Sequence, residues 1–239
     1  MSSPSAFDVP TIARPLSTVD VVIFTVLDAR LQVLLVKRPD APDEPFPNCW
    51  ALPGGFVDVE QDADLASCAL RKLQQKTGVQ SPYLEQVGSW GGRQRDPRGW
   101  SVTHLYFALI PTPPVLSPRE AGGAGWFALD GQQVGVALAF DHAALLAAAV
   151  RRLRNKVEYT SLPAFLLPAE FTLSELQQMY EIVLERAVEK SAFRTRVLAV
   201  GLVEPVEKVR TGANRPAQLY RLSQSHEMVY FPRALSPRK

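Results

Sequence analysis

Two consecutive apolar runs near the start of the chain constrain its fold more than any other feature. The runs are VDVVIFTVLD and LQVLLVKRP, and only the short step DAR separates them. Runs of this length that are rich in β-branched residues are typical of strands. They predict two neighbouring strands of a sheet.

Helix and strand patterns continue through the first two thirds of the chain. Residues 65–77 have the apolar spacing of a helix, and Gly78 lies just past its end. Its expected apolar face consists of Leu65, Ala69, Leu70 and Leu73. Strand-like runs follow around residues 84–89, around residues 101–110 and at GWFAL. A helix is expected over residues 141–156, and its basic end RRLRNK suits the helix dipole. This order predicts an α/β domain.

The C-terminal third has a different order of elements. After SLPAFLLPAE, which contains two prolines, the chain has an amphipathic helix pattern that opens with a capping box from Thr172 to Glu175. A second helix is expected to start near Ser191 and end before Gly201, and the short strands LVEPV and AQLYRL follow, separated by EKVRTGANRP. Helix, turn, helix and β-hairpin predict a winged helix. Its expected core positions are Leu173, Leu176, Tyr180, Val183, Leu184, Phe193, Val197 and Val200.

Charge is divided unevenly along the chain. Residues 1–150 carry 11 Lys+Arg and 15 Asp+Glu, a net charge of −4, whereas residues 151–239 carry 15 and 9, a net charge of +6. The basic C-terminal third favours a phosphate-bearing partner. No apolar run reaches the roughly 18–20 residues of a membrane span, and the N-terminus has no apolar signal region, so we expect a cytoplasmic protein without a membrane partner. Cys49 and Cys68 lack a CxxC partner and are expected to be reduced thiols.

The segment GGFVDVEQDADLASCALRKLQQKTGV resembles the Nudix box. The match is anchored by Gly54, Gly55 and Phe56 at one end and by RKL and KTGV at the other. From Gly55 to Arg71 there are 16 positions, which is two more than in the family pattern. The resemblance implies a Nudix-type α/β/α sandwich with a mixed sheet.

The carboxylates that carry the chemistry of this family are replaced. A Nudix hydrolase binds divalent metal through glutamates spaced i, i+3 and i+4, which lie on one helix face. Here the three positions hold Lys72, Gln75 and Lys76. Two ammonium groups and an amide disfavour a metal and the activation of water, so we predict no metal site, no catalytic residues and no hydrolase activity. The acids upstream are interpreted as loop and first-turn residues that suit the helix dipole; they are Asp58, Glu60, Asp62 and Asp64.

The frame of a ligand site is nevertheless kept. Lys72 and Lys76 are candidates to neutralise a pyrophosphate, and solvated surface lysines are the alternative interpretation. The loop RQRDPRG resembles that of ADP-ribose-type Nudix proteins, where Arg95, Asp96 and Arg98 would engage phosphate and ribose hydroxyls, and a purely structural loop is the alternative. The predicted ligand-binding residues are Arg38, Gly54, Gly55, Phe56, Lys72, Lys76, Arg95, Asp96 and Arg98.

Three segments together resemble the NrtR family of Nudix-related transcriptional regulators of NAD metabolism. They are LRKLQQKTGV, YLEQVGSWGGRQRDPRGWSV and the stretch from FTLSELQQMYE through FRTRVLAVGLVEP to GANRPAQLYRL, so the resemblance runs from about Thr18 to Leu222. It implies a homodimeric repressor that binds double-stranded operator DNA at genes of NAD synthesis or salvage. ADP-ribose or a related NAD metabolite would release the repressor, and no cofactor is implied.

The resemblance assigns the helix from Ser191 to Val200 to the major groove of DNA. Ser191 is expected to be its N-cap and to present backbone N–H groups to a phosphate. The wing has the composition for phosphate or minor-groove contacts. The predicted DNA-binding residues are Lys190, Ser191, Arg194, Thr195, Arg196, Lys208, Arg210, Asn214 and Arg215.

The expected organisation follows from these segments. It is a mobile arm over residues 1–17, a degenerate Nudix sensor over 18–157, a linker over 158–170, a winged helix over 171–223 and a tail over 224–239. Three alternatives stay open: an active ADP-ribose pyrophosphatase with an accessory winged helix, a sugar-responsive regulator of the same architecture, and a winged helix that contacts protein instead of DNA. We expect coupling between sensor and DNA reader to pass through the helix over 141–156 and SLPAFLLPAE, because they connect the two parts.

Overall fold

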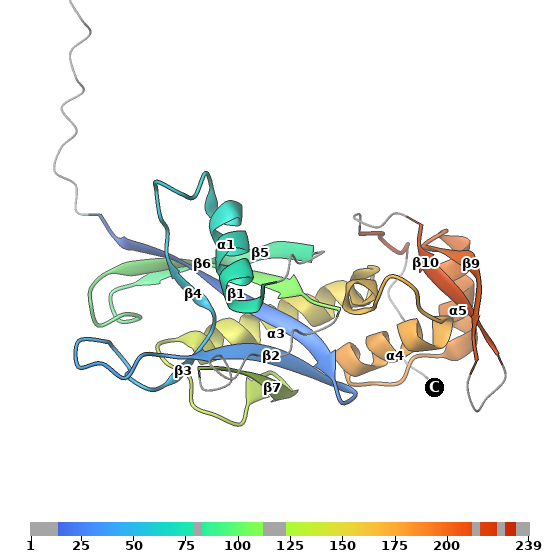
Figure 1. The fold of residues 1–239 in the computed structure, drawn as a ribbon, viewed down its shortest axis with the longest axis horizontal. Helices are drawn as coiled ribbons and strands as arrows, with labels where there is room; N and C mark the ends of the chain where they lie inside the picture. The colour runs from blue at the N-terminus through green and yellow to red at the C-terminus, as the bar shows by residue number, and fades with distance from the viewer. Residues whose placement is uncertain (1–13, 79–82, 112–122, 212–215, 224–227, 233–239) are drawn as a thin grey trace, which may run out of the picture.

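A mixed sheet with helices on both faces forms one end of the molecule, and a smaller region of helices and a hairpin forms the other (Figure 1). The computed structural model describes residues 14–78, 83–111, 123–211, 216–223 and 228–232. The sheet order is β5-β6-β1-β2-β7-β8, with β3 paired to β2 and β4 paired to β1. The strands are β1 (Leu16–Leu27), β2 (Arg30–Lys37), β3 (Trp50–Ala51), β4 (Gly54–Phe56), β5 (Tyr83–Gly92), β6 (Ser101–Leu109), β7 (Ala124–Asp130) and β8 (Gln133–Val134).

The two apolar runs form neighbouring antiparallel strands, as predicted. In the β1–β2 pair, Leu27 lies opposite Arg30 and Phe24 lies opposite Val33. On its other edge, β1 pairs in parallel with β6. Successive side chains of a strand point to opposite faces of the sheet. Val21 and Ile23 accordingly belong to the core on one face, whereas Val22 and Phe24 belong to the core on the other. Because both faces are buried, the run is apolar almost throughout.

Helix α1 (Leu65–Thr77) covers one face of the sheet, and its bounds agree with the prediction. Asp64 caps its N-terminus with its carboxylate, and Gly78 ends it in the left-handed conformation with φ of 66°. Cys68, Ala69 and Leu73 face the core. The expected place of Leu70 on this face was wrong, because it follows Ala69 by one helical step of about 100° and is exposed.

Helix α3 (His142–Val157) covers the opposite face and continues into η1 (Leu162–Leu166). Every residue of η1 is buried. The segment predicted to link two domains is thus packed into the interior, within one apolar cluster that extends from the sheet to the C-terminal helices. This shared core joins the sheet to the C-terminal helices.

The C-terminal region has the order predicted for a winged helix. It consists of α4 (Leu173–Leu184), α5 (Lys190–Ala199), β9 (Val203–Arg210) and β10 (Ala217–Leu222). Thr172 and Glu175 form the expected capping box, and β9 extends to Arg210, inside the stretch predicted as loop. The fold class predicted from the sequence, a Nudix-type sandwich followed by a winged helix, is confirmed. In the part of the chain that the structure describes, no helix is long and apolar enough to cross a membrane.

Residues 228–232 return to the junction between the two regions. The backbone N–H of Phe231 donates to the Tyr159 carbonyl at 2.7 Å, and that of Ser161 donates to the Val229 carbonyl at 2.9 Å. The Phe231 side chain is 6% exposed and lies near Tyr180 of α4. Part of the predicted tail therefore belongs to the core. At the other terminus, β1 begins at Leu16, inside the predicted arm, and residues 1–13 lie outside the described residues.

Candidate ligand cavity and nucleic-acid interface

A cavity of about 200 Å³ opens between the loop after β2, the β5–β6 loop and the start of α3. Seven of the nine predicted ligand-binding residues line it: Arg38, Gly54, Gly55, Lys76, Arg95, Asp96 and Arg98. Phe56 lies beside it, beneath the Arg98 guanidinium at 5.0 Å from the ring centre. Lys72 lies next to Gly55, where a Cβ would come within 3.0 Å of the lysine Nζ. The fold therefore brings residues from four separate segments to one place.

The arginines of the RDPRG loop already have protein partners. Arg95 donates from Nε and NH2 to the two carboxylate oxygens of Asp141, each at 3.0 Å, and from NH1 to Ser101. Asp96 is 4% exposed and accepts from the backbone N–H, Nε and NH2 of Arg98. Burial opposes ionisation of Asp96, but the bonds from Arg98 outweigh it and hold its pKa below the usual range. These side chains fix the loop, and Arg98 is the most accessible of them.

The face of α1 that carries Lys72 and Lys76 is basic. Lys76 is exposed and lines the cavity, and neither lysine forms an ion pair with any residue that the structure describes. Among the described residues there is also no cluster of three or more His, Cys, Asp or Glu side chains that would hold a metal ion. The donor set at this face suits an anion and does not suit a divalent cation.

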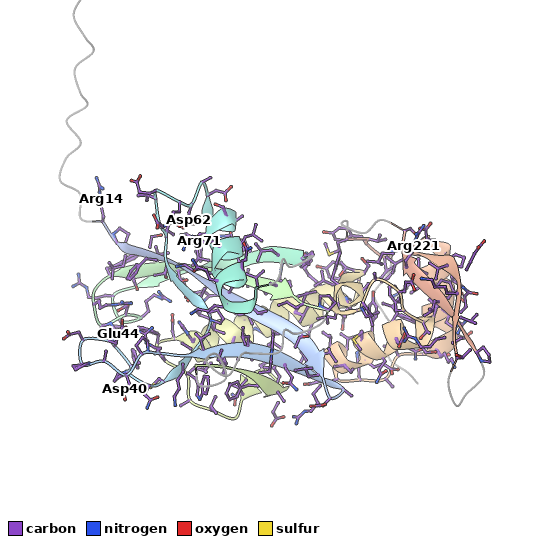
Figure 2. All side chains as sticks on the ribbon, in the orientation of Figure 1. Arg14, Asp40, Glu44, Asp62, Arg71 and Arg221 are labelled. Atoms are coloured by element: carbon purple, nitrogen blue, oxygen red, sulfur yellow. The ribbon has the colours of Figure 1, made fainter. Side chains whose placement is uncertain are left out.

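Two of the four upstream acids, Asp62 and Asp64, have partners in α1, and none lies in its first turn. Asp62 accepts two hydrogen bonds from Arg71, at 2.7 and 2.6 Å, and the pair lies beside the start of α1 in Figure 2. The Arg71 guanidinium holds the pKa of Asp62 well below its usual range. Asp64 is the helix N-cap, and the Ser67 backbone N–H lowers its pKa. Neither carboxylate lines the cavity.

Two polar residues at the floor of the cavity were missed by the sequence analysis. Asp20 of β1 is 6% exposed and accepts from the Thr103 hydroxyl at 2.7 Å. His142 at the start of α3 accepts from the Leu52 backbone N–H at its Nδ1, so its proton lies on Nε2, which is 3.8 Å from Asp20 Oδ1. Burial lowers the pKa of His142, although Asp20 opposes the shift, so the imidazole is neutral. A charged residue inside an otherwise apolar strand was the signal for Asp20.

Phe140 is a third cavity residue that the sequence analysis missed. It has a φ of 53°, which is uncommon for a bulky side chain. Its ring contacts Phe46 at 4.7 Å and lies under the Arg38 guanidinium, also at 4.7 Å. Arg38 itself pairs with Glu44 at 2.5 Å. Figure 2 labels Glu44 on the loop before β3. The predicted ligand residue Arg38 thus stiffens the cavity rim through an aromatic contact and an ion pair.

The exposed face of α5 is the candidate surface for nucleic acid. Lys190, Ser191, Arg194 and Thr195 are exposed on it, whereas Phe193 and Val197 are buried. The prediction that Ser191 is the N-cap was wrong. Glu189 occupies that position, and its carboxylate accepts from the backbone N–H groups of Ser191 at 2.9 Å and Ala192 at 2.5 Å. A phosphate at this helix end would have to displace that carboxylate.

Arg196 does not share the exposed face of α5. It is half-buried, its guanidinium lies 5.4 Å from the Phe231 ring centre, and burial lowers its pKa. The structure therefore places this predicted DNA contact against the C-terminal segment. On the wing, Lys208 pairs with Glu170 at 2.7 Å, and Arg210 pairs with Glu175. Exposed pairs of this kind contribute at most about 1 kcal/mol, so phosphates can replace the acids. Asn214 and Arg215 lie outside the described residues.

Helix α3 extends from the cavity to the winged helix. Asp141, which precedes it, holds Arg95 of the cavity wall, and His142 lies at the cavity floor. Near its other end, Arg154 donates to the Val183 carbonyl of α4 at 3.0 Å. The Tyr180 hydroxyl of α4 donates to the Thr160 carbonyl at 2.7 Å. Helix α3 thus joins the cavity to α4, the first helix of the C-terminal region.

Comparison with known proteins identifies relatives of the whole chain. The matching family models are the NUDIX domain, over residues 16–146, and the NrtR DNA-binding winged helix domain, over residues 163–222. The chain is 50% identical over 222 residues to the ADPR responsive transcriptional repressor NtrR of Acinetobacter baylyi, covering 92% of this chain and 87% of that protein.

Two solved structures resemble the fold. Shewanella oneidensis NrtR in complex with a 27mer DNA has a TM-score of 0.83 and 39% identity, covering 92% of this chain and 99% of that chain. The NUDIX domain of the same protein in complex with ADP ribose has a TM-score of 0.53 and 41% identity, covering 62% of this chain and 94% of that chain. The similarity therefore extends over both regions of the molecule.

Proposed function

The chain belongs to the NrtR family, and on this premise we propose that it is a transcriptional repressor released from operator DNA by ADP-ribose bound in its Nudix cavity. The genes it controls are those of NAD synthesis or salvage, and it acts in the cytoplasm as a homodimer. The domain division that accompanies this proposal follows the expected one, with a sensor that ends at residue 157 and a winged helix over 171–223, except that the sensor begins by Leu16, where β1 starts.

The observation that carries the proposal is the combination of cavity and basic face on α1. Lys76 lines the cavity and Lys72 lies against Gly55, at positions where a hydrolase of this kind has metal-binding carboxylates. A diphosphate group carries negative charge that two ammonium groups stabilise directly. The ligand can therefore be held without the divalent cation that activates water. A domain that binds without hydrolysing its ligand is suited to sensing.

The winged helix supplies the surface for DNA. Lys190 and Arg194 project from the exposed face of α5, and the wing carries Lys208 and Arg210. In winged helices the second helix enters the major groove, while strand and loop cations contact the phosphates. Exposed cations on adjoining elements support this mode of binding over a protein contact, because a protein interface of comparable strength is apolar at its centre.

Coupling between the two sites is proposed to run along α3. The helix is anchored at the cavity by the Arg95–Asp141 pair and at α4 by Arg154 and Thr160. A ligand that changes the Arg95 position displaces the start of α3, and a rigid helix transmits the displacement to α4 and then to α5. Substituting Arg154 with glutamine tests this route. Unchanged DNA affinity together with an unchanged response to ADP-ribose would exclude it.

A binding assay on the protein's own upstream promoter DNA tests the function. Fluorescence anisotropy at low salt is expected to show binding that ADP-ribose reverses and that NAD and simple sugars do not. Reversal by a sugar alone would favour a sugar-responsive regulator instead. Absence of DNA binding at low salt would contradict the proposal.

A hydrolysis assay tests the proposed loss of enzyme activity. Incubation with ADP-ribose and Mg²⁺ or Mn²⁺ is expected to give product at the background rate. Turnover of about one per second, within the ordinary range of enzymes, would show an active pyrophosphatase. Light scattering on the purified chain measures the proposed dimer in the same preparation.

A further inference from the structure

The floor of the cavity contains a buried carboxylate that the proposed function does not yet use. We propose that Asp20 Oδ1 accepts a hydrogen bond from a ribose hydroxyl of the bound nucleotide, and so makes the effector cavity selective for a pentose with free hydroxyl groups. This inference rests on the proposed function, because it assigns one part of the ADP-ribose ligand to one residue.

The two oxygens of Asp20 have different surroundings. Oδ2 accepts from the Thr103 hydroxyl at 2.7 Å. Oδ1 has no hydrogen bond to any residue that the structure describes, and Nε2 of the neutral His142 ring is 3.8 Å away. Arg95 NH2 lies 4.0 Å from Oδ2 and is already paired with Asp141. Both separations exceed hydrogen-bond length. Asp20 lines the cavity and its side chain is 8% exposed, so a buried carboxylate with one oxygen unbonded among the described residues lies in the cavity wall.

Glycine at position 54 leaves room for this oxygen. β4 pairs with β1 so that Gly54 lies opposite Asp20. A Cβ at Gly54 would lie 2.1 Å from Asp20 Oδ1 and 2.6 Å from the Val19 carbonyl oxygen, which no side chain can accommodate. Gly54 and Asp20 both line the cavity. Gly54 thus leaves room for the Asp20 carboxylate, in addition to being part of the Nudix box.

The distribution of charge in the cavity indicates different positions for the phosphate groups and for the ribose of the ligand. Lys37 and Lys76 line the cavity and form no ion pair with residues described by the structure, so they attract phosphate groups. Asp20 repels phosphate and requires a donor, and the surrounding cations disfavour an ammonium group there. A neutral hydroxyl satisfies both conditions. Leaving a buried charged acceptor unpaired is costly, so a ligand that supplies this hydroxyl is favoured over one that lacks it.

Isothermal titration on the full chain tests the assignment. The ligands are ADP-ribose, which has two riboses, and ADP, which has one. Asp20→Asn keeps the side-chain shape and removes the charge, and we expect it to weaken ADP-ribose binding about 10- to 100-fold. An equal loss for ADP assigns Asp20 to the adenosine ribose. A loss confined to ADP-ribose assigns it to the terminal ribose.

A matched variant controls for the change in charge. Asp130→Asn alters an exposed acid at the end of β7, away from the cavity, and is expected to leave both affinities unchanged within about twofold. Thermal melting checks that Asp20→Asn is folded. If it is not folded, the wild-type chain is titrated with ADP and 2′,3′-dideoxy-ADP, and ADP-ribose is compared with ADP. The inference then predicts that 2′,3′-dideoxy-ADP binds more weakly than ADP, or that ADP binds more weakly than ADP-ribose.

Two results overturn the inference, and a third concerns the function alone. Folded Asp20→Asn that binds ADP-ribose as wild type does shows that the carboxylate faces water in the complex. Tighter binding by this variant shows that a phosphate lies next to Asp20. Failure of the wild-type chain to bind ADP-ribose contradicts the proposed function, and this failure is seen before any variant is compared.

Discussion

Replacing Phe231 with alanine tests whether the segment over residues 228–232 anchors the winged helix. Phe231 is 6% exposed, and its ring lies 6.4 Å from the ring of Tyr180 in α4 and 5.4 Å from the Arg196 guanidinium in α5. Its backbone N–H donates to the Tyr159 carbonyl just after α3. One side chain therefore lies near both α4 and α5, while its backbone is hydrogen-bonded to the segment just after α3.

The expected cost follows from the volume removed. Truncating a buried phenylalanine to alanine lowers the free energy of unfolding by about 3–5 kcal/mol. We expect about 3 kcal/mol here, at the low end of this range, because Phe231 keeps 6% exposure and so lies at the edge of the core. The lost cation–π contact with Arg196 is part of this figure. DNA affinity should fall as well, since α5 loses the contact that fixes its inner side.

Tyr230 supplies the matched control for this experiment. It is the neighbouring residue but is 60% exposed, so Tyr230→Ala should change the free energy of unfolding by less than about 1 kcal/mol. Urea denaturation measures both variants, and hydrogen exchange at Ser161, whose N–H donates to the Val229 carbonyl, reports release of the segment. Equal effects of the two substitutions would refute an anchoring role for the Phe231 side chain.

Three further predictions concern the two sites. Lys76→Glu should weaken ADP-ribose binding at least about tenfold by titration calorimetry, because it places a carboxylate beside the diphosphate; unchanged affinity would remove Lys76 from the site. DNA affinity should fall steeply with salt, and Arg194→Ala should reduce the slope of log affinity against log salt by about one if it contacts a phosphate, whereas an unchanged slope would exclude that contact. Because burial lowers the pKa of His142, the unfolded chain binds more protons just below pH 6.5, so the free energy of unfolding should fall as pH decreases through that range. His142→Gln should flatten this dependence in urea titrations, and an unaltered pH profile would contradict the assignment.

Much of the fold could be predicted because its signals are local. The bounds of α1 follow from apolar spacing and from the glycine that ends the helix, and the capping box at Thr172 marks the start of α4. The β1–β2 pair follows from two β-branched runs with a short connection. Each of these features depends on residues within a few positions of one another, where backbone preference and periodicity act directly.

The partners of the candidate site residues could not be predicted in the same way. The sequence indicated Arg95 as a ligand residue, but its partner Asp141 depends on how the β5–β6 loop packs against the start of α3. The same holds for Arg196, whose helical position suggested an outward direction and whose actual neighbour, Phe231, lies 35 positions away in the chain. A helical pattern gives an angle around the axis, but the element that covers that side is set by packing.

The sequence by itself determined the charge on one face of α1, because Lys72, Gln75 and Lys76 stand where the resemblance to the Nudix box implies metal-binding glutamates. These residues decide the local charge wherever the helix lies. Only the tertiary structure decided which groups meet at the cavity floor, because Asp20 and His142 are brought together by the pairing of β1 and by the packing of α3. Contacts between residues so far apart in the chain arise from burial of the shared core, and no short stretch of sequence encodes them.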